Sequence, residues 1–249
     1  MSKNDNTPAG DSTQGIANSF GSYKVYAAGG LFTHHELATN VFIKEAVWRL
    51  SNEKFQLVLP QSKELEELDA AYLRNVNLLD VVKADIIIAR FDGPELDAGT
   101  VVEYAVAKSL GKPTVILRSD YRHLSGKGID DPYNLMVRSW PRIVEVHIDS
   151  LRNYVGILTE EREAIGDSVT FQAAIKDELN SVQKSTDEFA KKIIGGLEMV
   201  IKMKSPFPPE YQEVVYKASR YSPGSGFDQL LTENELDEII QRLRKNGTL

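Results

Sequence analysis

The chain has 249 residues, of which 42% are hydrophobic and 26% are charged, and its formal net charge is −7. This length suffices for one large domain, or a domain with an appendage, that buries a full hydrophobic core. The absence of cysteine excludes disulfides, thiolate metal sites and a cysteine nucleophile. The apolar runs are much shorter than the roughly 20 residues of a membrane span, and no basic stripe typical of duplex nucleic-acid binding is visible. We therefore expect neither a membrane nor a nucleic-acid partner.

The first twenty residues are rich in Ser, Asn, Asp, Gly and Thr, which predicts a disordered N-terminal segment over residues 1–20. This segment is polar and lacks the apolar centre of a signal peptide. Together with the lack of cysteine, it favours a reducing, cytoplasmic setting.

From residue 21 onward, the spacing of apolar residues predicts strands that alternate with helices. In chain order, we predict a strand at 23–28, a helix at 36–50, a strand at 55–59, a helix at 64–82, a strand at 85–91, a helix at 99–110, a strand at 113–118, a loop at 119–133 and a last strand at 143–148. The continuous apolar run at 85–91 is typical of a strand buried on both faces of a parallel sheet. The order predicts an α/β domain with a doubly wound parallel sheet over residues 21–150, whose ligands bind beyond the carboxyl ends of the strands.

The final hundred residues have a different pattern. Apolar spacing predicts helices at 151–165, 171–203, 210–219 and 233–244, separated by loops that contain Pro and Gly. We interpret residues 151–249 as a helical C-terminal extension. Such an extension could cover the core, build an oligomer interface or reach into a neighbouring site.

Candidate catalytic residues follow the third predicted strand. Asp92 opens a polar loop, Asp97 and Gly99 lie at the start of the next helix, and Glu103 lies one turn inside it. A carboxylate within the apolar stretch around Glu103 needs a partner and is a candidate nucleophile for glycosyl transfer. The alternative is structural, with Asp97 as an N-cap and Glu103 as a first-turn acid that the helix dipole favours.

A second candidate segment follows the first predicted strand. Tyr26 and the run from Gly29 and Gly30 through Leu31 and Phe32 could hold a flat base and a sugar, or could form an ordinary strand-end turn. The pair of glycines lacks the full dinucleotide fingerprint. His34 and His35 are adjacent and face different directions on a helix, so we expect no metal site and no cofactor.

Together these segments resemble the nucleoside 2-deoxyribosyltransferase family over roughly residues 23–147. The resemblance is carried by Val25-Tyr-Ala-Ala-Gly-Gly-Leu-Phe32, Lys83-Ala-Asp-Ile-Ile-Ile-Ala89, Asp97-Ala-Gly-Thr-Val-Val-Glu103, Gly111-Lys-Pro113 and Asn134-Leu-Met136. It implies a flavodoxin-like sheet, in agreement with the predicted order of elements.

The resemblance also implies roles for individual residues. Glu103 would attack the anomeric carbon, expel the base and hold the deoxyribosyl group as an ester, which a second base then collects. Asp97 would bind sugar hydroxyls, Tyr26 would orient Glu103, and the segment from Gly29 to Phe32 would line the base pocket, with Asp92 and Gly99 also on the substrate side. Asn134 and Met136 would reach a neighbouring subunit's site, which implies a homo-oligomer with shared sites.

One position departs from the family pattern. The family usually has an aspartate eight residues before Asp85, where this chain has Asn77. An asparagine can hydrogen-bond a base but cannot deliver a proton as a carboxylic acid does. Another acid such as Asp80 or Asp92 could replace it, the chain could have altered substrate choice or low activity, or the asparagine could be an engineered change that traps a ligand.

Three functions are compatible with this pattern. The first is exchange of nucleobases between deoxynucleosides, with deoxynucleosides and free bases as partners. The second is hydrolysis of (deoxy)nucleosides or their monophosphates, and the third is a catalytically weak nucleoside-binding module. Phosphate-binding relatives carry Gly-Ser and Arg after the first strand, whereas this chain has Ala28-Gly-Gly-Leu31 there, which favours a nucleoside over a nucleotide.

Overall fold

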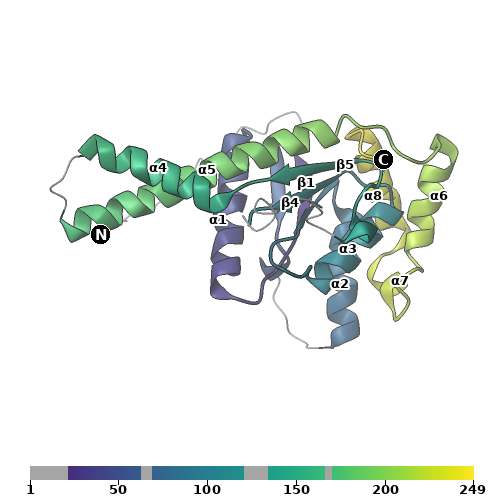
Figure 1. Ribbon diagram of the computed structural model, residues 1–249. Coiled ribbons are helices and arrows are strands. Elements are labelled where there is room, and N and C mark those ends of the chain that lie inside the picture. The colour runs from purple at the N-terminus through teal and green to yellow at the C-terminus, as the bar shows by residue number, and fades with distance from the viewer. Residues whose placement is uncertain (1–21, 63–68, 121–133, 166–169) are drawn as a thin grey trace, which may run out of the picture.

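The computed structural model describes residues 22–62, 69–120, 134–165 and 170–249. Its centre is a five-stranded parallel sheet in the order β2-β1-β3-β4-β5 (Figure 1). The strands are β1 (Tyr23–Ala28), β2 (Phe55–Val58), β3 (Ile86–Arg90), β4 (Thr114–Arg118) and β5 (Ile143–His147). This order is that of the flavodoxin-like doubly wound fold, so the predicted fold class is confirmed.

Helices lie on both faces of the sheet and extend beyond it (Figure 1). They are α1 (His34–Leu50), α2 (Ala70–Lys83), α3 (Ala98–Ser109), α4 (Ser150–Ile165), α5 (Phe171–Val200), α6 (Pro209–Ser219), α7 (Phe227–Leu230) and α8 (Glu233–Lys245), with short 3₁₀ turns η1 (Pro60–Ser62) and η3 (Leu135–Val137). The predicted disordered segment 1–20 and most of the predicted loop 119–133 lie outside the described residues.

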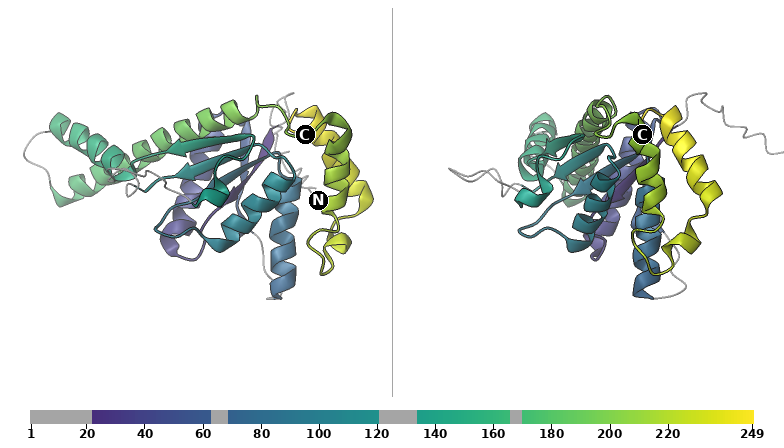
Figure 2. Two further views of the ribbon diagram at one scale, coloured as in Figure 1. Left: turned by 45° about the vertical axis from the view of Figure 1, so that its right-hand side comes forward. Right: turned by 90° about the vertical axis from the view of Figure 1, so that its right-hand side faces the viewer.

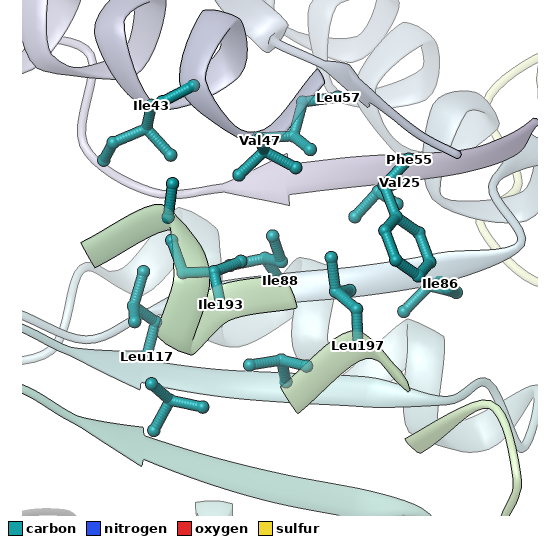
Figure 3. Packing of buried hydrophobic residues seen from close by; sticks show 14 of the residues in the cluster. Val25, Ile43, Val47, Phe55, Leu57, Ile86, Ile88, Leu117, Ile193 and Leu197 are labelled. Atoms are coloured by element: carbon teal, nitrogen blue, oxygen red, sulfur yellow. The ribbon is translucent and has the colours of Figure 1, made fainter. Parts of the chain in front are cut away.

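One face of the sheet packs against α1 and α5 (Figure 3). Alternate strand residues such as Val25, Ile86 and Ile88 meet Val47 of α1 and Ile193 of α5 in one buried cluster. The helical extension therefore supplies a layer of the main core, the first of the three roles considered for it.

A glycine allows α5 to approach the sheet closely. A Cβ added at Gly196 would lie 2.8 Å from Cγ2 of Val146 in β5. Because both backbones are fixed by their own helix and strand, no side chain fits between them. Gly196 thus sets how near the helix lies to β5.

The other face of the sheet packs against α2 and α3. Tyr26 and Ile87 meet Val81 of α2 and Ala107 of α3 in a second cluster. Beyond the amino ends of the strands, α6, α7 and α8 form a further apolar cluster with the ends of α2 and α3. In Figure 2 these C-terminal helices stand at the end of the molecule opposite the hairpin of α4 and α5.

The boundaries differ slightly from prediction, for local reasons. Helix α1 begins two residues earlier than predicted, because Thr33 and Glu36 form a capping box. Helix α5 ends at Val200, three residues earlier than predicted, in a turn. The described part of α2 begins at Ala70, where Asp69 caps it, and residues 64–68 of the predicted helix lie outside the described residues.

Candidate active site

The structure brings Tyr26 and Glu103 together. Tyr26 lies in β1 and Glu103 in α3, and the Tyr26 hydroxyl donates a hydrogen bond of 2.7 Å to Oε1 of Glu103. Tyr26 is fully buried. Burial, followed by the negative charge of Glu103, raises the pKa of Tyr26 above its ordinary value. The hydroxyl therefore stays protonated and donates to Glu103 throughout the ordinary pH range.

Asp97 has the structural role that the sequence offered as an alternative, and it also faces a cavity. It is the N-cap of α3, since its Oδ2 accepts from the Thr100 amide at 2.7 Å and from the Thr100 hydroxyl at 2.8 Å. These bonds fix the carboxylate at the carboxyl end of the sheet. Gly99 follows in the first turn, and a Cβ there would lie 3.2 Å from Oδ2 of Asp97.

A cavity of about 450 Å³ lies beyond the carboxyl ends of the strands. Its lining comes from strand ends, α1 and the base of the hairpin of α4 and α5, and consists of Gly30, Phe32, His35, Glu36, Thr39, Arg90, Asp92, Glu95, Leu96, Asp97, Ser119, Asp120, Ser150 and Phe189. Carboxylates outnumber basic side chains in this lining, so the cavity disfavours an anionic ligand. A cavity of this size fits a small molecule.

Helix α3 connects the cavity with the Tyr26–Glu103 hydrogen bond. Asp97 lines the cavity at the start of α3, and Glu103 follows less than two turns later on the same helix. The lining of the cavity does not include Tyr26 or Glu103. Tyr26 packs on the face of the sheet that α2 and α3 cover.

The loop after β1 is held by its neighbours. Glu36 Oε2 accepts from the amides of Phe32 and Thr33 and from the Thr33 hydroxyl, and the hydroxyl bond in particular lowers the pKa of Glu36. A Cβ added at Gly30 would lie 2.1 Å from Oε1 of Glu36, so this close approach requires glycine. Arg90, at the end of β3, donates a hydrogen bond of 3.1 Å to the Gly30 carbonyl and so holds the loop against the end of β3.

Two further aspartates are held at strand ends. Both oxygens of Asp92 accept from Ser119, at 2.5 Å from its amide and 2.8 Å from its hydroxyl. Asp120 accepts from the Gly93 amide at 2.7 Å and pairs with Arg118 at 3.2 Å. These bonds fix both carboxylates at the carboxyl ends of the strands.

The remaining predicted residues lie at different places. Asn77 is half-buried on α2, one turn before Asp80, whose charge contributes to the raised pKa of Tyr26. Leu31 is half-buried in the loop after β1. Asn134 caps η3 through a 2.9 Å bond from the Met136 amide, and Met136 is 77% exposed. Neither of these last two lines the cavity, and their predicted role in a neighbouring site stays a prediction.

Several cavity residues were not predicted from the sequence. Arg90 and Ser119 directly follow or end predicted strands, so the rule that ligands bind beyond strand ends could have identified them. Ser150 and Phe189 come from the helical extension, where no local signal indicates that they lie near the cavity. Among the described residues, no group of His, Asp and Glu could hold a metal ion, and no helix has the length and apolar content needed to cross a membrane.

Part of the chain is similar to known proteins. The family model described as nucleoside 2-deoxyribosyltransferase matches residues 25–136, and no curated protein sequence matches the chain. A conserved protein from Enterococcus faecalis V583 is 22% identical over 70% of this chain and 99% of its own, with a TM-score of 0.42. A 2-deoxyribosyltransferase from Bacillus psychrosaccharolyticus is 22% identical over 51% of this chain and 85% of its own, with a TM-score of 0.37. A CMP N-glycosidase from Clostridium botulinum is 13% identical over 55% of this chain and 98% of its own, with a TM-score of 0.36.

The matched region runs from β1 to η3 and includes Tyr26, Asp97 and Glu103. It contains both partners of the buried hydrogen bond and the carboxylate at the start of α3. Residues 25–136 are thus similar to the nucleoside 2-deoxyribosyltransferase family.

Proposed function

We propose that the protein transfers 2-deoxyribose between nucleobases through a covalent ester on Glu103. The observation that carries this proposal is the 2.7 Å bond from the buried Tyr26 hydroxyl to Glu103. A donor that stays protonated holds the carboxylate in one orientation, which is what a nucleophile that attacks a fixed carbon needs.

The chemistry balances with this chain's own groups and two bases. The second carboxylate oxygen of Glu103 bonds to the anomeric carbon while the bond from that carbon to the base nitrogen breaks. The departing base takes the electron pair and a proton from a neighbouring acid such as Asp80 or Asp92, and the incoming base returns a proton to that acid. An incoming base then attacks the same carbon from the opposite side to the ester and releases Glu103, so two inversions retain the configuration.

Asp97 and the cavity supply the binding interactions in this proposal. The carboxylate of Asp97 can accept hydrogen bonds from sugar hydroxyls. Gly30 and Phe32 of the loop after β1 line the cavity and would contact the base. The excess of carboxylates over Arg90 and His35 supports an uncharged nucleoside in preference to a nucleotide.

The test is a base-exchange assay on the full chain. A deoxynucleoside is incubated with and without a second free base, and products are separated by chromatography. The proposal expects a new deoxynucleoside when the acceptor base is present and little base release without it. Base release at the same rate with and without acceptor would instead identify a hydrolase.

The absence of any turnover, in the wild type and in Asn77→Asp, would overturn both enzymatic functions. Binding of a deoxynucleoside without turnover, measured by calorimetry, would then identify a binding module. Deoxynucleoside monophosphates serve as a matched comparison, and we expect them to react more slowly because the cavity is rich in carboxylates.

A further inference from the structure

Helix α5 is apolar along one side for its whole length, but only part of that side is covered. In its C-terminal half, this side packs on the sheet through Ala190, Ile193, Leu197 and Val200. At spacings of three and four residues, the same side continues toward the N-terminus through Phe171, Ile175, Leu179 and Val182. These four side chains are 42–81% exposed, because the N-terminal half of α5 projects past the sheet (Figure 1).

Several polar contacts join α4 and α5 along the seam between them. Asn153 donates to the Ser185 hydroxyl at 3.0 Å, Arg162 pairs with Glu178 at 3.1 Å, and Lys184 pairs with Glu161. Between Phe171 and Phe189, the buried residues of α5 are Asp177 and Ser181, and both are polar. The projecting half of α5 therefore exposes large apolar side chains while its buried positions are polar, the reverse of a helix that is stable alone in water.

The exposed apolar residues of the hairpin share one face. Among the described side chains of α4, the large apolar residues that are exposed are Leu151 and Val155. On each helix, these exposed apolar residues lie a little more than a quarter of a turn around the helix axis from the side that faces the other helix. Seen from the N-terminus of each helix, the rotation has the same sense. Because the two helices run antiparallel, both stripes lie on the same side of the hairpin. We call this set of six the hairpin face: Leu151, Val155, Phe171, Ile175, Leu179 and Val182.

The charges next to the hairpin face do not suit a charged partner. By helical position, Arg162 and Glu178 are the nearest charged residues, and they pair with each other. The hairpin face therefore lacks the electrostatic complementarity that a nucleic acid or a charged peptide would need. A surface of the same apolar character is the better match.

We infer that the hairpin face binds the hairpin face of a second copy of this chain, so that two hairpins form a four-helix bundle. One continuous apolar face is self-complementary under a two-fold rotation. With their neighbours, six large side chains from each copy approach the roughly 800 Å² per partner that stable interfaces bury. Ser150 and Phe189 at the base of the hairpin line the cavity, so the second copy lies beside the cavity mouth.

The test compares two variants that differ by one position on α5. Leu179→Glu places a charge on the hairpin face, whereas Asn180→Glu places the same charge on the polar side of the same turn, where Asn180 is exposed. By sedimentation velocity on the full chain, we expect the wild type and Asn180→Glu to self-associate equally and Leu179→Glu to associate at least about tenfold more weakly. A monomeric wild type at all concentrations, or equal association of both variants, would overturn the inference.

A second measurement remains decisive if Leu179→Glu fails to fold. The chain has no cysteine, so Leu179→Cys and Asn180→Cys each introduce a single thiol. We expect a maleimide to modify the Leu179→Cys thiol several-fold more slowly at high than at low protein concentration, and the Asn180→Cys thiol at one rate. Concentration-independent modification at both positions would contradict the proposed interface.

Discussion

Charged side chains gather both at the carboxyl ends of the strands (the carboxyl edge of the sheet) and at their amino ends (the amino edge), but the surroundings of the two groups differ. At the carboxyl edge, Asp92, Asp97 and Asp120 line a space of about 450 Å³. At the amino edge, Asp85 and Lys112 are fully buried beside the C-terminal helices. A ligand could reach the charged groups of the carboxyl edge, whereas those of the amino edge bond to other parts of the chain.

The amino edge satisfies its charges with groups of the chain itself. Asp85 accepts from the Lys24 amide at 2.8 Å and from Asn246 at 2.9 Å, and it pairs with Arg242. Lys112 donates to the carbonyls of Val82 and Ala84 at 3.0 and 2.7 Å, and its Nζ lies 4.9 Å from the centre of the Tyr216 ring. Burial, the largest cause, lowers the pKa of Lys112 to about 7. A motif residue such as Asp85 is thus structural, although it lies within the segments that carry the family resemblance.

The largest expected effect is at the carboxyl edge. Glu103→Gln keeps the shape of the side chain but removes the nucleophile, so we expect turnover in the base-exchange assay to fall on the order of 10³-fold or more. The unfolding midpoint in urea should stay close to that of the wild type. Normal turnover in this variant would remove Glu103 from the mechanism.

The matching change at the amino edge should act on stability. Asp85→Ala leaves Arg242 and the Lys24 amide without their carboxylate, and breaking such a buried pair costs about 3–5 kcal/mol of unfolding free energy. Urea denaturation measures this loss, and kcat per folded molecule should change little. A variant as stable as the wild type would show that the amino edge is not held by this pair.

A smaller effect is expected for the tyrosine beside the nucleophile. Tyr26→Phe removes one hydrogen bond to a charged group, which is worth about 1.5–3 kcal/mol, so kcat should fall roughly 10- to 100-fold. Because Tyr26 acts through Glu103, KM should change less than kcat. Equal loss in kcat and gain in KM would instead indicate a role in binding.

Restoring a carboxylic acid on α2 should increase activity. Asn77→Asp provides a proton donor at the position where the family usually has one, and general acids contribute about 10²–10⁴-fold. We expect kcat for bases that leave as protonated species to rise about tenfold or more. Asn77→Ala is the control, and an equal rate in both variants would show that position 77 does not deliver a proton.

The last effect is a pH dependence at the amino edge. The pKa values of Lys108 and Lys112 are lowered to about 7 in the folded protein, so between pH 7 and the ordinary lysine pKa the unfolded chain binds more protons. Stability should therefore rise with pH over this interval, by at most about 1.4 kcal/mol per pH unit for each lysine, and should show no further change from these groups below pH 7.

Urea midpoints between pH 7.5 and 9.5 measure this slope. Lys112→Met should reduce the slope relative to the wild type, whatever its effect on absolute stability. An unchanged slope in Lys112→Met would show that Lys112 does not titrate in this range. The raised pKa values of Tyr104 and Tyr216 oppose the trend only near and above pH 10.

Most strands and helices of the sheet domain could be predicted because their signals are local. The continuous run Ile86–Arg90 is buried almost throughout, as its composition predicts. Asp97 caps α3, as its position before an apolar helix predicts. The Tyr26–Glu103 hydrogen bond spans 77 residues, and only the family resemblance, not spacing, indicated it.

Contacts made by the extension could not be predicted from local patterns. The apolar side of α5 has the same spacing in both halves, so the sequence does not distinguish the half that covers the sheet from the half that projects. The pair of Arg242 and Asp85 joins residues 157 positions apart, and neither residue has a local feature that identifies its partner. The uncovered half of α5 and the Arg242–Asp85 pair both depend on where the boundaries of the sheet lie in three dimensions.

The sequence by itself determined the alternation of strands and helices, the polar residues at strand ends and the absence of cysteine chemistry, because periodicity and composition act over a few residues. Tertiary structure decided that Asp85 at the amino edge bonds to Arg242 of α8, while the aspartates at the carboxyl edge line a cavity. It also decided that α5 continues past the sheet with its apolar side uncovered. The physical reason is that burial is a property of surfaces brought together from distant parts of the chain, so identical patterns have different surroundings at the two edges.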